Sequence, residues 1–215
     1  MPEAGWNMGK SGRYGKYGEI KRLDRLRGNR GAPGGIRSRK ETLPSEILWR
    51  RKGTQAQPRL SLKRARGEDV EYLKDLSRQA FGRYGPYEAM IAAWFHSEKT
   101  KTYLARRGKA RVGFVMIGPT YLLEGFHPVC ELLAIAVASP WRGMGVGRAL
   151  MSKALTEAAD QGIHTVILHT EPSNDSAVRL FERSGFVRTS SPRRGFYPRG
   201  QDAVLMTKRL PSLGR

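Results

Sequence analysis

Residues 135–150 read IAVASPWRGMGVGRAL, and this stretch decides the fold. An apolar run typical of a buried strand leads through glycines at positions 143, 145 and 147 into a segment with helical periodicity. Alternate glycines let the main chain approach a ligand closely, and the first turn of a helix presents unpaired N–H groups and about half a positive charge. The stretch therefore predicts a strand, a pyrophosphate-binding turn and a helix in direct succession.

Two nucleotide-binding motifs of similar composition are excluded by residue identity. A dinucleotide-binding turn needs the spacing G-x-G-x-x-G, but Arg148 lies three residues after Gly145, and Leu150 lies three residues after Gly147. The Gly-Lys-Ser/Thr sequence of a P-loop is also missing from the stretch. The pyrophosphate that this turn is expected to bind therefore belongs to another class of ligand.

The sequence on both sides of this stretch predicts a mixed α/β domain. Strand-like alternation or apolar density marks residues 58–64, 102–105, 110–117, 129–138, 163–170, 186–189 and 203–207, and helical spacing marks residues 68–80, 87–95, 145–159 and 173–185. The order strand, helix, strand from residue 129 to residue 170 predicts a crossover between two parallel strands. The strands before it follow one another with short connections, which predicts an antiparallel meander. We therefore expect one sheet with both parallel and antiparallel neighbours, covered by helices.

The positive charge of the chain is concentrated in its first third. The net charge is +20, and residues 1–67 carry 18 of the 39 Lys and Arg but only 5 of the 19 Asp and Glu. Nine of the first 35 residues are glycine, so residues 1–57 cannot bury enough apolar surface to offset their ordering entropy. We expect a disordered basic extension at residues 1–57, followed by a folded domain at residues 58–215.

Two roles fit a basic extension of this kind. Lys and Arg release counterions from phosphates, and exposed Trp6, Tyr14 and Tyr17 can stack on bases, which favours contact with RNA or the ribosome. A solubilising leader with no specific partner explains the same charge. Both roles stay open from the sequence.

Composition excludes several other classes of protein. The longest apolar run, Leu132–Ala138, has seven residues, whereas a membrane-spanning helix needs about 18. The start MPEAGWNMGK lacks the apolar core of a signal peptide, so we expect a soluble, cytoplasmic protein without a membrane partner. The single cysteine, Cys130, forms neither an internal disulfide nor a cysteine-based metal cluster, and we expect no metal.

The segment from Arg142 to Gly147 resembles the acetyl-CoA signature of the GNAT superfamily of N-acetyltransferases, Arg/Gln-x-x-Gly-x-Gly/Ala. The likeness continues in SNDSAVRLFERSGF (173–186) and in RRGFYPRGQDAVLM (193–206), which is similar to the tail of N-alpha-acetyltransferases of the ribosomal-protein alanine and amino-terminal types. It covers residues 58–210. The resemblance implies an acetyl-CoA-dependent acyltransferase whose mixed, mostly antiparallel sheet is splayed at a central parallel strand pair, with helices on both faces.

The resemblance also implies where acetyl-CoA is held. Backbone groups of Ile135, Ala136 and Val137 would bind the pantetheine arm. The pyrophosphate would lie on the turn formed by Arg142, Gly143, Met144, Gly145, Val146, Gly147 and Arg148. Asn174 would contact the cofactor near its thiol end, although the residue also suits the N-cap of a helix.

Amine acetylation needs a base, and two side chains are candidates for it. Glu131 is the lone carboxylate in an apolar strand, and the two-residue period points it to the same side as Leu133, Ile135 and Val137. His169 lies near the end of the crossover strand, and an unperturbed histidine pKa of about 6.5 suits a base at neutral pH. The resemblance implies that Glu131 occupies the position of a glutamate base found in many members of the superfamily. It implies that His169 occupies that of a catalytic histidine in one eukaryotic amino-terminal type, where bacterial alanine-type enzymes have glutamate. One or both residues would relay a proton through water.

The general acid departs from the pattern of the superfamily. Phe181 occupies the position where the superfamily usually has a tyrosine beside the CoA sulfur, so the ring is kept and the hydroxyl is lost. Tyr197, which follows Phe196 in a block that resembles a substrate-binding tyrosine pair, is a candidate for substrate contact or proton donation. Cys130 is expected to pack rather than to act as a nucleophile, because direct transfer needs no acyl-enzyme.

The resemblance implies a primary amine as acceptor and favours the α-amine of a protein N-terminus. An α-amine has a pKa of about 7.7 to 8.0 and loses its proton more easily than a lysine at about 10.4. The positive charge of the chain favours acidic or ribosome-associated acceptors over polycations. A small-molecule amine stays open as acceptor, as does a different class of protein, an RNA- or ribosome-binding protein whose GNAT-like domain is inactive or senses CoA.

Overall fold

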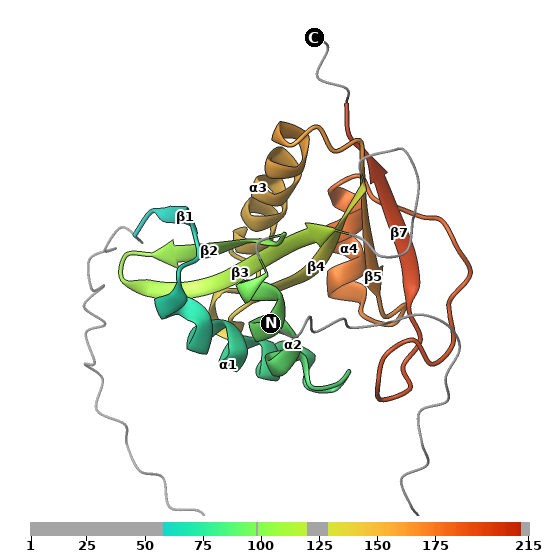
Figure 1. Ribbon diagram of the computed structural model, residues 1–215, viewed down its shortest axis with the longest axis horizontal. Helices are drawn as coiled ribbons and strands as arrows, with labels where there is room; N and C mark the ends of the chain where they lie inside the picture. Colours follow the sequence, from blue (N-terminus) through green and yellow to red (C-terminus); the bar gives the residue numbers. More distant parts are fainter. Residues whose placement is uncertain (1–57, 98, 120–128, 212–215) are drawn as a thin grey trace, which may run out of the picture. The chain divides into compact units, whose positions relative to one another are not determined.

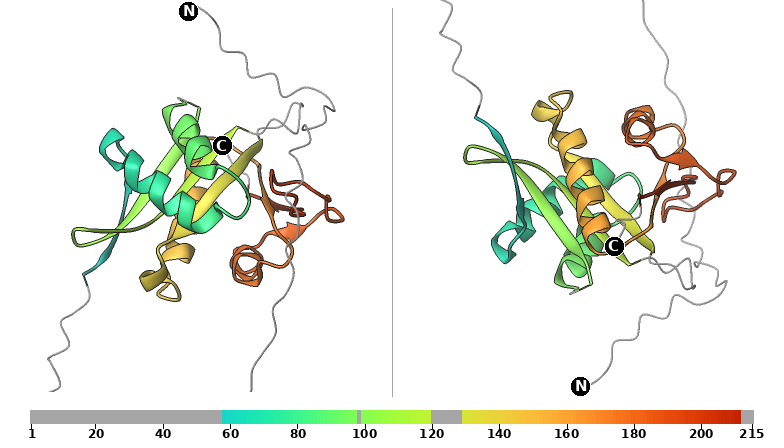
Figure 2. Two further views of the ribbon diagram at one scale, coloured as in Figure 1. Left: turned by 90° about the horizontal axis from the view of Figure 1, so that it is seen from below. Right: turned by 90° about the horizontal axis from the view of Figure 1, so that it is seen from above.

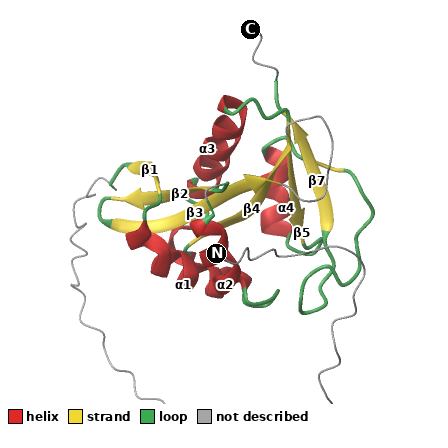
Figure 3. Ribbon diagram, in the orientation of Figure 1, coloured by secondary structure: helices red, strands yellow, loops and turns green. Residues whose placement is uncertain are grey.

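The structure of the chain, a computed structural model, describes residues 58–97, 99–119 and 129–211. Seven strands and four α-helices lie in these ranges. Figure 3 shows how the helices and strands are arranged. The strands are β1 (Leu60–Arg64), β2 (Lys101–Arg107), β3 (Ala110–Pro119), β4 (Val129–Val137), β5 (Thr165–Thr170), β6 (Val187–Arg188) and β7 (Val204–Arg209). The helices are α1 (Val70–Phe81), α2 (Tyr87–His96), α3 (Val146–Asp160) and α4 (Asp175–Arg183), with short 3-10 turns at Gly67–Asp69 and Ser139–Trp141.

The strands form one sheet in the order β1-β2-β3-β4-β5-β7-β6. All neighbours are antiparallel except β4 and β5, which are parallel and joined by α3. Every predicted strand and helix is found, with ends that move by at most a few residues, and the mixed, mostly antiparallel sheet is confirmed. The predicted extension at residues 1–57, and its contact with RNA or the ribosome, lie outside the described residues.

Helices cover both faces of the sheet, as predicted (Figures 1 and 2). On one face, α3 and α4 bury a core that includes Leu150, Met151 and Phe181 against β2 to β5 and β7. On the other face, α1 and α2 bury Leu73 and Ile91. No helix in the described residues is both long and apolar enough to cross a membrane.

The central parallel pair is short, and the sheet opens beyond it. Pairing of β4 with β5 runs only from Val129 and Thr165 to Glu131 and Ile167. Past this point β4 stays with β3, whereas β5 stays with β7 up to Thr170. Figure 1 shows β5 and β7 turning away from β2, β3 and β4. The predicted splay is therefore confirmed.

A β-bulge in β4 corrects the predicted orientation of Glu131. Met116 of β3 pairs with Ala134, but the next residue, Ile117, pairs with Leu132, so Leu133 is an extra residue on β4. The extra residue shifts the alternation of side chains by one. Ile135 and Val137 pack into the α3 core, whereas Leu133 packs into the core under α1 and α2. The prediction that Glu131 shares a side with Ile135 and Val137 is therefore wrong, because a strict two-residue period fails across a bulge.

Candidate active site

Glu131 and His169 meet where the two central strands part. Glu131 is level with Ile167 on β5, and His169 follows two residues later on the same side of that strand. His169 Nδ1 lies 3.0 Å from Glu131 Oε1, and the two side chains are only 12% and 17% exposed. The sequence proposed each residue separately, and the structure joins them in one hydrogen-bonded pair.

The pair fixes the roles of the two ring nitrogens. An ionised carboxylate only accepts hydrogen bonds, so Nδ1 of His169 carries the proton that is shared with Glu131. Nε2 then keeps its lone pair and is the atom able to accept a proton from an amine. This arrangement resembles the carboxylate–histidine pair in which the carboxylate orients a histidine base.

An aromatic wall holds the His169 ring. The ring of Phe196 stacks on it with centroids 4.4 Å apart and planes 16° apart. Tyr197 meets Phe196 edge to face at 5.1 Å and packs on Tyr84 at 4.6 Å. Such contacts restrict the rotation of the imidazole and keep Nδ1 directed at Glu131.

Tyr197 lies beside the pair through its contact with Phe196, which stacks on His169. It is only 8% exposed, and burial, followed by the charges of neighbouring tyrosines and carboxylates, raises its pKa well above the usual range. Its hydroxyl has no hydrogen-bond partner among the described residues. A hydroxyl that keeps its proton and donates to no other group is able to donate a hydrogen bond to a carbonyl oxygen.

A polar cluster next to the pair was not predicted from the sequence. The buried Tyr84 hydroxyl donates to Glu171 Oε2 at 2.8 Å and accepts from Arg83 Nη2 at 2.6 Å, and Arg83 also pairs directly with Glu171. The amide nitrogen of Asn174 lies 3.5 Å from the same hydroxyl. The only sequence signals were the aromatic, glycine-rich turn FGRYGPY (81–87) and the position of Glu171 two residues after His169. The cluster joins the α1–α2 turn to the start of α4.

The glycine turn before α3 has the open geometry that its sequence predicts. Gly143 and Gly145 have φ angles of +75° and +79°, and a Cβ atom at either position would meet no other atom within 4 Å. The first helical bond joins the Ala149 N–H to the Gly145 carbonyl, so the amides of the first helical turn have no acceptor within the helix. Arg142 is held against the end of β4 by a hydrogen bond from Nε to the Val137 carbonyl at 3.1 Å. Met144 stands out from the turn and is 44% exposed.

The splay also leaves a strand edge open. Residues 132–137 of β4 pair with β3 on one side and have no described strand on the side of β5. The contacts predicted for Ile135, Ala136 and Val137 would use this edge, since an extended chain can pair with an open strand through its backbone. The edge leads directly into the glycine turn.

Two further predicted residues lie on α4. Asn174 is the N-cap, and its Oδ1 accepts hydrogen bonds from the Ala177 amide at 3.3 Å and from the Ser176 hydroxyl. Capping alone explains its presence, so its contact with a cofactor stays a prediction. Phe181 is 4% exposed and packs edge to face on Phe186 at 6.2 Å, within the α3 core.

The described residues favour neither a cysteine nucleophile nor a metal site. Burial, with a smaller effect of the Glu131 charge, raises the pKa of the Cys130 thiol to about 12, which disfavours the thiolate. No group of three or more His, Cys, Asp or Glu residues in the described part of the chain is arranged to hold a metal ion.

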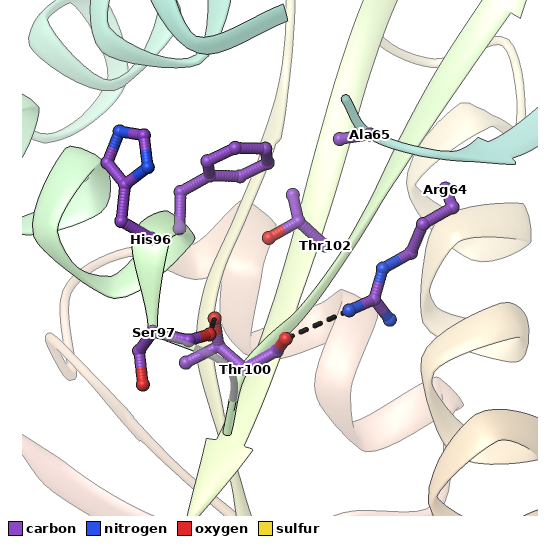
Figure 4. A pocket seen from close by; sticks show the side chains of 7 residues that line it. Arg64, Ala65, His96, Ser97, Thr100 and Thr102 are labelled. Atoms are coloured by element: carbon purple, nitrogen blue, oxygen red, sulfur yellow. Dashed lines mark hydrogen bonds between the residues drawn. The ribbon is translucent and has the colours of Figure 1, made fainter. Parts of the chain in front are cut away.

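A pocket of about 290 Å³ lies away from Glu131 and His169, between the end of β1, the end of α2 and the start of β2 (Figure 4). Arg64 donates to the Thr100 carbonyl at 3.0 Å. The Thr100 hydroxyl bonds to the carbonyls of Trp94 and Ser97, at the C-terminal end of α2. These groups satisfy one another, so they close the end of a helix rather than await a ligand.

Comparison with known proteins identifies relatives of this arrangement. The profile of the acetyltransferase (GNAT) family matches residues 70–186. A mycothiol acetyltransferase of Cellulomonas flavigena is 40% identical in an alignment of 136 positions that covers 58% of this chain and 39% of that protein. The chain spans between 18% and 39% of the length of the mycothiol acetyltransferases that it matches.

Solved structures share the fold at lower identity. The ribosomal-protein-S18-alanine N-acetyltransferase of Escherichia coli superposes with a TM-score of 0.62 at 21% identity, covering 73% of this chain and 97% of that one. NAA60 of Arabidopsis thaliana, solved in complex with acetyl-CoA, gives a TM-score of 0.61 at 18% identity, covering 71% and 99%. At these identities the superpositions establish the fold.

Proposed function

Because this chain belongs to the GNAT family of acetyltransferases, we propose that it transfers an acetyl group from acetyl-CoA to a primary amine, the α-amine of a protein N-terminus. The observation that carries the proposal is the hydrogen-bonded pair of Glu131 and His169 at the point where β4 and β5 part. The pair offers a proton acceptor beside an open strand edge and an open helix N-terminus, which is the combination that the reaction needs.

The residues present fit acetyl-CoA. Gly143 and Gly145 leave open space in front of α3, and the free amides of its first turn suit a pyrophosphate. The β5-facing edge of residues 132–137 suits the amide groups of a pantetheine arm. When bound, acetyl-CoA supplies a thioester carbonyl that an uncharged amine can attack.

Within this proposal, His169 accepts the amine proton at Nε2. Glu131 holds the ring by its hydrogen bond to Nδ1 and stabilises the imidazolium that forms. Both side chains are mostly buried, so water weakens this stabilisation less than it would at the surface. Phe196 keeps the ring in the orientation that makes the transfer possible.

One tyrosine hydroxyl near the pair supplies a donor that Phe181 lacks. Tyr197 presents its unpaired hydroxyl beside the pair, where it would donate to a carbonyl oxygen that gains negative charge. Tyr84 lies 3.5 Å from the amide of Asn174, the residue expected near the thiol end of the cofactor. The only hydroxyl proton of Tyr84 is donated to Glu171 Oε2 at 2.8 Å, so Tyr84 orders this end of the site and does not protonate the departing sulfur.

The acceptor is the least constrained part of the proposal. Similarity to a ribosomal-protein-S18-alanine N-acetyltransferase supports a protein N-terminus. The second candidate is a small-molecule amine, favoured by the 40% identity with a mycothiol acetyltransferase. The two candidates differ in what surrounds the amine, so substrate tests separate them.

The test uses the full chain and three kinds of acceptor. We expect acetyl transfer to peptides with a free α-amine, and no transfer to the same peptides with a blocked N-terminus, even when they contain lysine. Transfer only to small amines would support the second candidate. The thermal midpoint measured with acetyl-CoA checks the cofactor independently, because ligand at about 100 times its Kd adds about 2.7 kcal/mol. Absence of both the shift and the transfer would refute the proposal.

A further inference from the structure

Two loops from distant parts of the sequence form the outer wall of the site. The α1–α2 turn, residues 82–86, is bonded to the β6–β7 connection, residues 189–203, through Arg199 N–H to the Tyr84 carbonyl at 3.2 Å and Gln201 Nε2 to the Arg83 carbonyl at 2.6 Å. Tyr84 and Tyr197 pack together beneath them with Ala203. The wall is therefore built as one unit beside the Glu131 and His169 pair.

This wall carries an excess of arginine. Arg193, Arg194 and Arg199 are exposed, and no described carboxylate lies within 4.0 Å of any of them. The acidic residue of the same connection, Asp202, accepts a hydrogen bond from the Gly195 amide at 2.9 Å instead of pairing with an arginine. Elsewhere exposed arginines occur both with an ion-pair partner, as Arg78 has in Asp75 at 2.8 Å, and without one, as at Arg209.

One of these guanidinium groups is close to the catalytic pair. Arg193 Cζ lies 5.6 Å from the centre of the Phe196 ring, and that centre lies 4.4 Å from the centre of the His169 ring. The guanidinium therefore lies no more than 10.0 Å from the imidazole. An extended peptide advances about 3.3 to 3.6 Å per residue, so roughly three residues of an extended acceptor would cover the distance from the imidazole to this guanidinium.

We infer that the unpaired arginines of this wall select acceptors that carry carboxylates close to the reacting amine, namely protein N-termini with Asp or Glu at the second or third position. The inference rests on the proposed acetyl transfer at Glu131 and His169. Arginine presents a planar fork of donors that matches a carboxylate, and its exposed position makes the attraction act on encounter as well as in the complex.

The experiment compares matched peptides that differ only at the second and third positions, as Glu-Glu, Gln-Gln or Lys-Lys. At low ionic strength we expect the kcat/KM of the acidic peptide to be about tenfold higher than that of the neutral peptide, because two partly exposed ion pairs with arginine would together contribute about a factor of ten. The basic peptide should have the lowest kcat/KM of the three. The advantage should shrink as salt is added. In the triple variant Arg193→Gln, Arg194→Gln, Arg199→Gln, the acidic-to-neutral ratio should fall below about twofold.

The matched control is Arg209→Gln. Arg209 is exposed at the far end of β7 and pairs in the sheet with Thr165, so the same loss of charge should leave the ratio unchanged. Equal rates for the three peptides, a preference for the basic one, or a ratio that survives the triple substitution would each overturn the inference while acetyl transfer itself stands. Free glutamate that is acetylated as well as the acidic peptide would overturn the assignment to protein N-termini.

A binding measurement keeps the inference separate from the chemistry. Fluorescence anisotropy of the labelled peptides, with CoA present, should show tighter binding of the acidic one, and this difference should be lost in the triple variant. If no acceptor is acetylated, the proposed function fails, yet the anisotropy still decides the role of the arginines. Displacement of the acidic peptide by an RNA oligonucleotide at lower concentration than by unlabelled peptide would overturn the choice of a peptide ligand.

Discussion

Substituting Glu131 with glutamine tests whether Glu131 acts through His169. The change keeps the shape of the side chain and removes the charge that faces Nδ1 at 3.0 Å. A hydrogen bond to a charged group contributes about 1.5 to 3 kcal/mol, and the low exposure of both side chains keeps this figure from being much reduced by water. At 1.36 kcal/mol per factor of ten, we expect kcat/KM to fall about 10- to 150-fold.

The assay is initial-rate release of the CoA thiol with a peptide acceptor, on Glu131→Gln, His169→Gln and the double variant. If the two residues act as one unit, the double variant should be no slower than His169→Gln alone, because Glu131 has nothing left to orient. Glu182→Gln on the outer side of α4 is the matched control, since Glu182 forms only an exposed pair with Arg188 at 3.5 Å. We expect this control to keep the normal rate.

Three results would refute the reasoning. Effects that multiply in the double variant would show that the residues act independently. A His169→Gln variant with normal activity would show that Glu131 alone is the base. A fall in rate that is matched by a lower thermal midpoint, or by a lost shift with acetyl-CoA, would show damage to folding or to cofactor binding instead.

The other predictions concern the parts that support the site. Phe196→Leu removes the ring that stacks on His169 at a centroid distance of 4.4 Å, so kcat should fall several-fold while the KM for acetyl-CoA stays unchanged. Steady-state kinetics measure both constants, and a higher KM for acetyl-CoA with a normal kcat would contradict this prediction. Gly145→Ala places a side chain at φ +79°, which costs about 1 to 2 kcal/mol of folding stability. Thermal denaturation of this variant should show a lower midpoint and a smaller shift with acetyl-CoA. The control Gly147→Ala should keep its thermal midpoint, because the added Cβ would lie at ordinary contact distance from Leu180. Burial alone would raise the pKa of Glu157, but hydrogen bonds from Lys101, Tyr103 and Lys153 outweigh it and lower the pKa from 4.5 to about 2. A depressed folded pKa contributes stability above the unfolded value and loses it as pH falls, so urea unfolding should weaken between about pH 4.5 and pH 2, and Glu157→Gln should flatten that part of the profile.

The sequence by itself determined the order and type of the elements and the turn that would hold a pyrophosphate. Helical and strand periodicity are local properties of the chain, and the glycines at 143 and 145 are required by positive φ angles that other residues adopt only at a cost. It also supplied Glu131 and His169 as separate candidates, because a carboxylate in an apolar strand and a histidine at a strand end stand out without any structure.

Only the tertiary structure decided how those candidates are used. The extra residue Leu133 in β4 arises from pairing with β3, so no period read along β4 could show that Glu131 faces away from Ile135. The 3.0 Å contact between Glu131 and His169 depends on the register of two parallel strands, which is set by packing across the sheet. Arg83, Tyr84 and Glu171 meet for the same reason, since residues nearly 90 positions apart come together only when the α1–α2 turn folds against the end of β5.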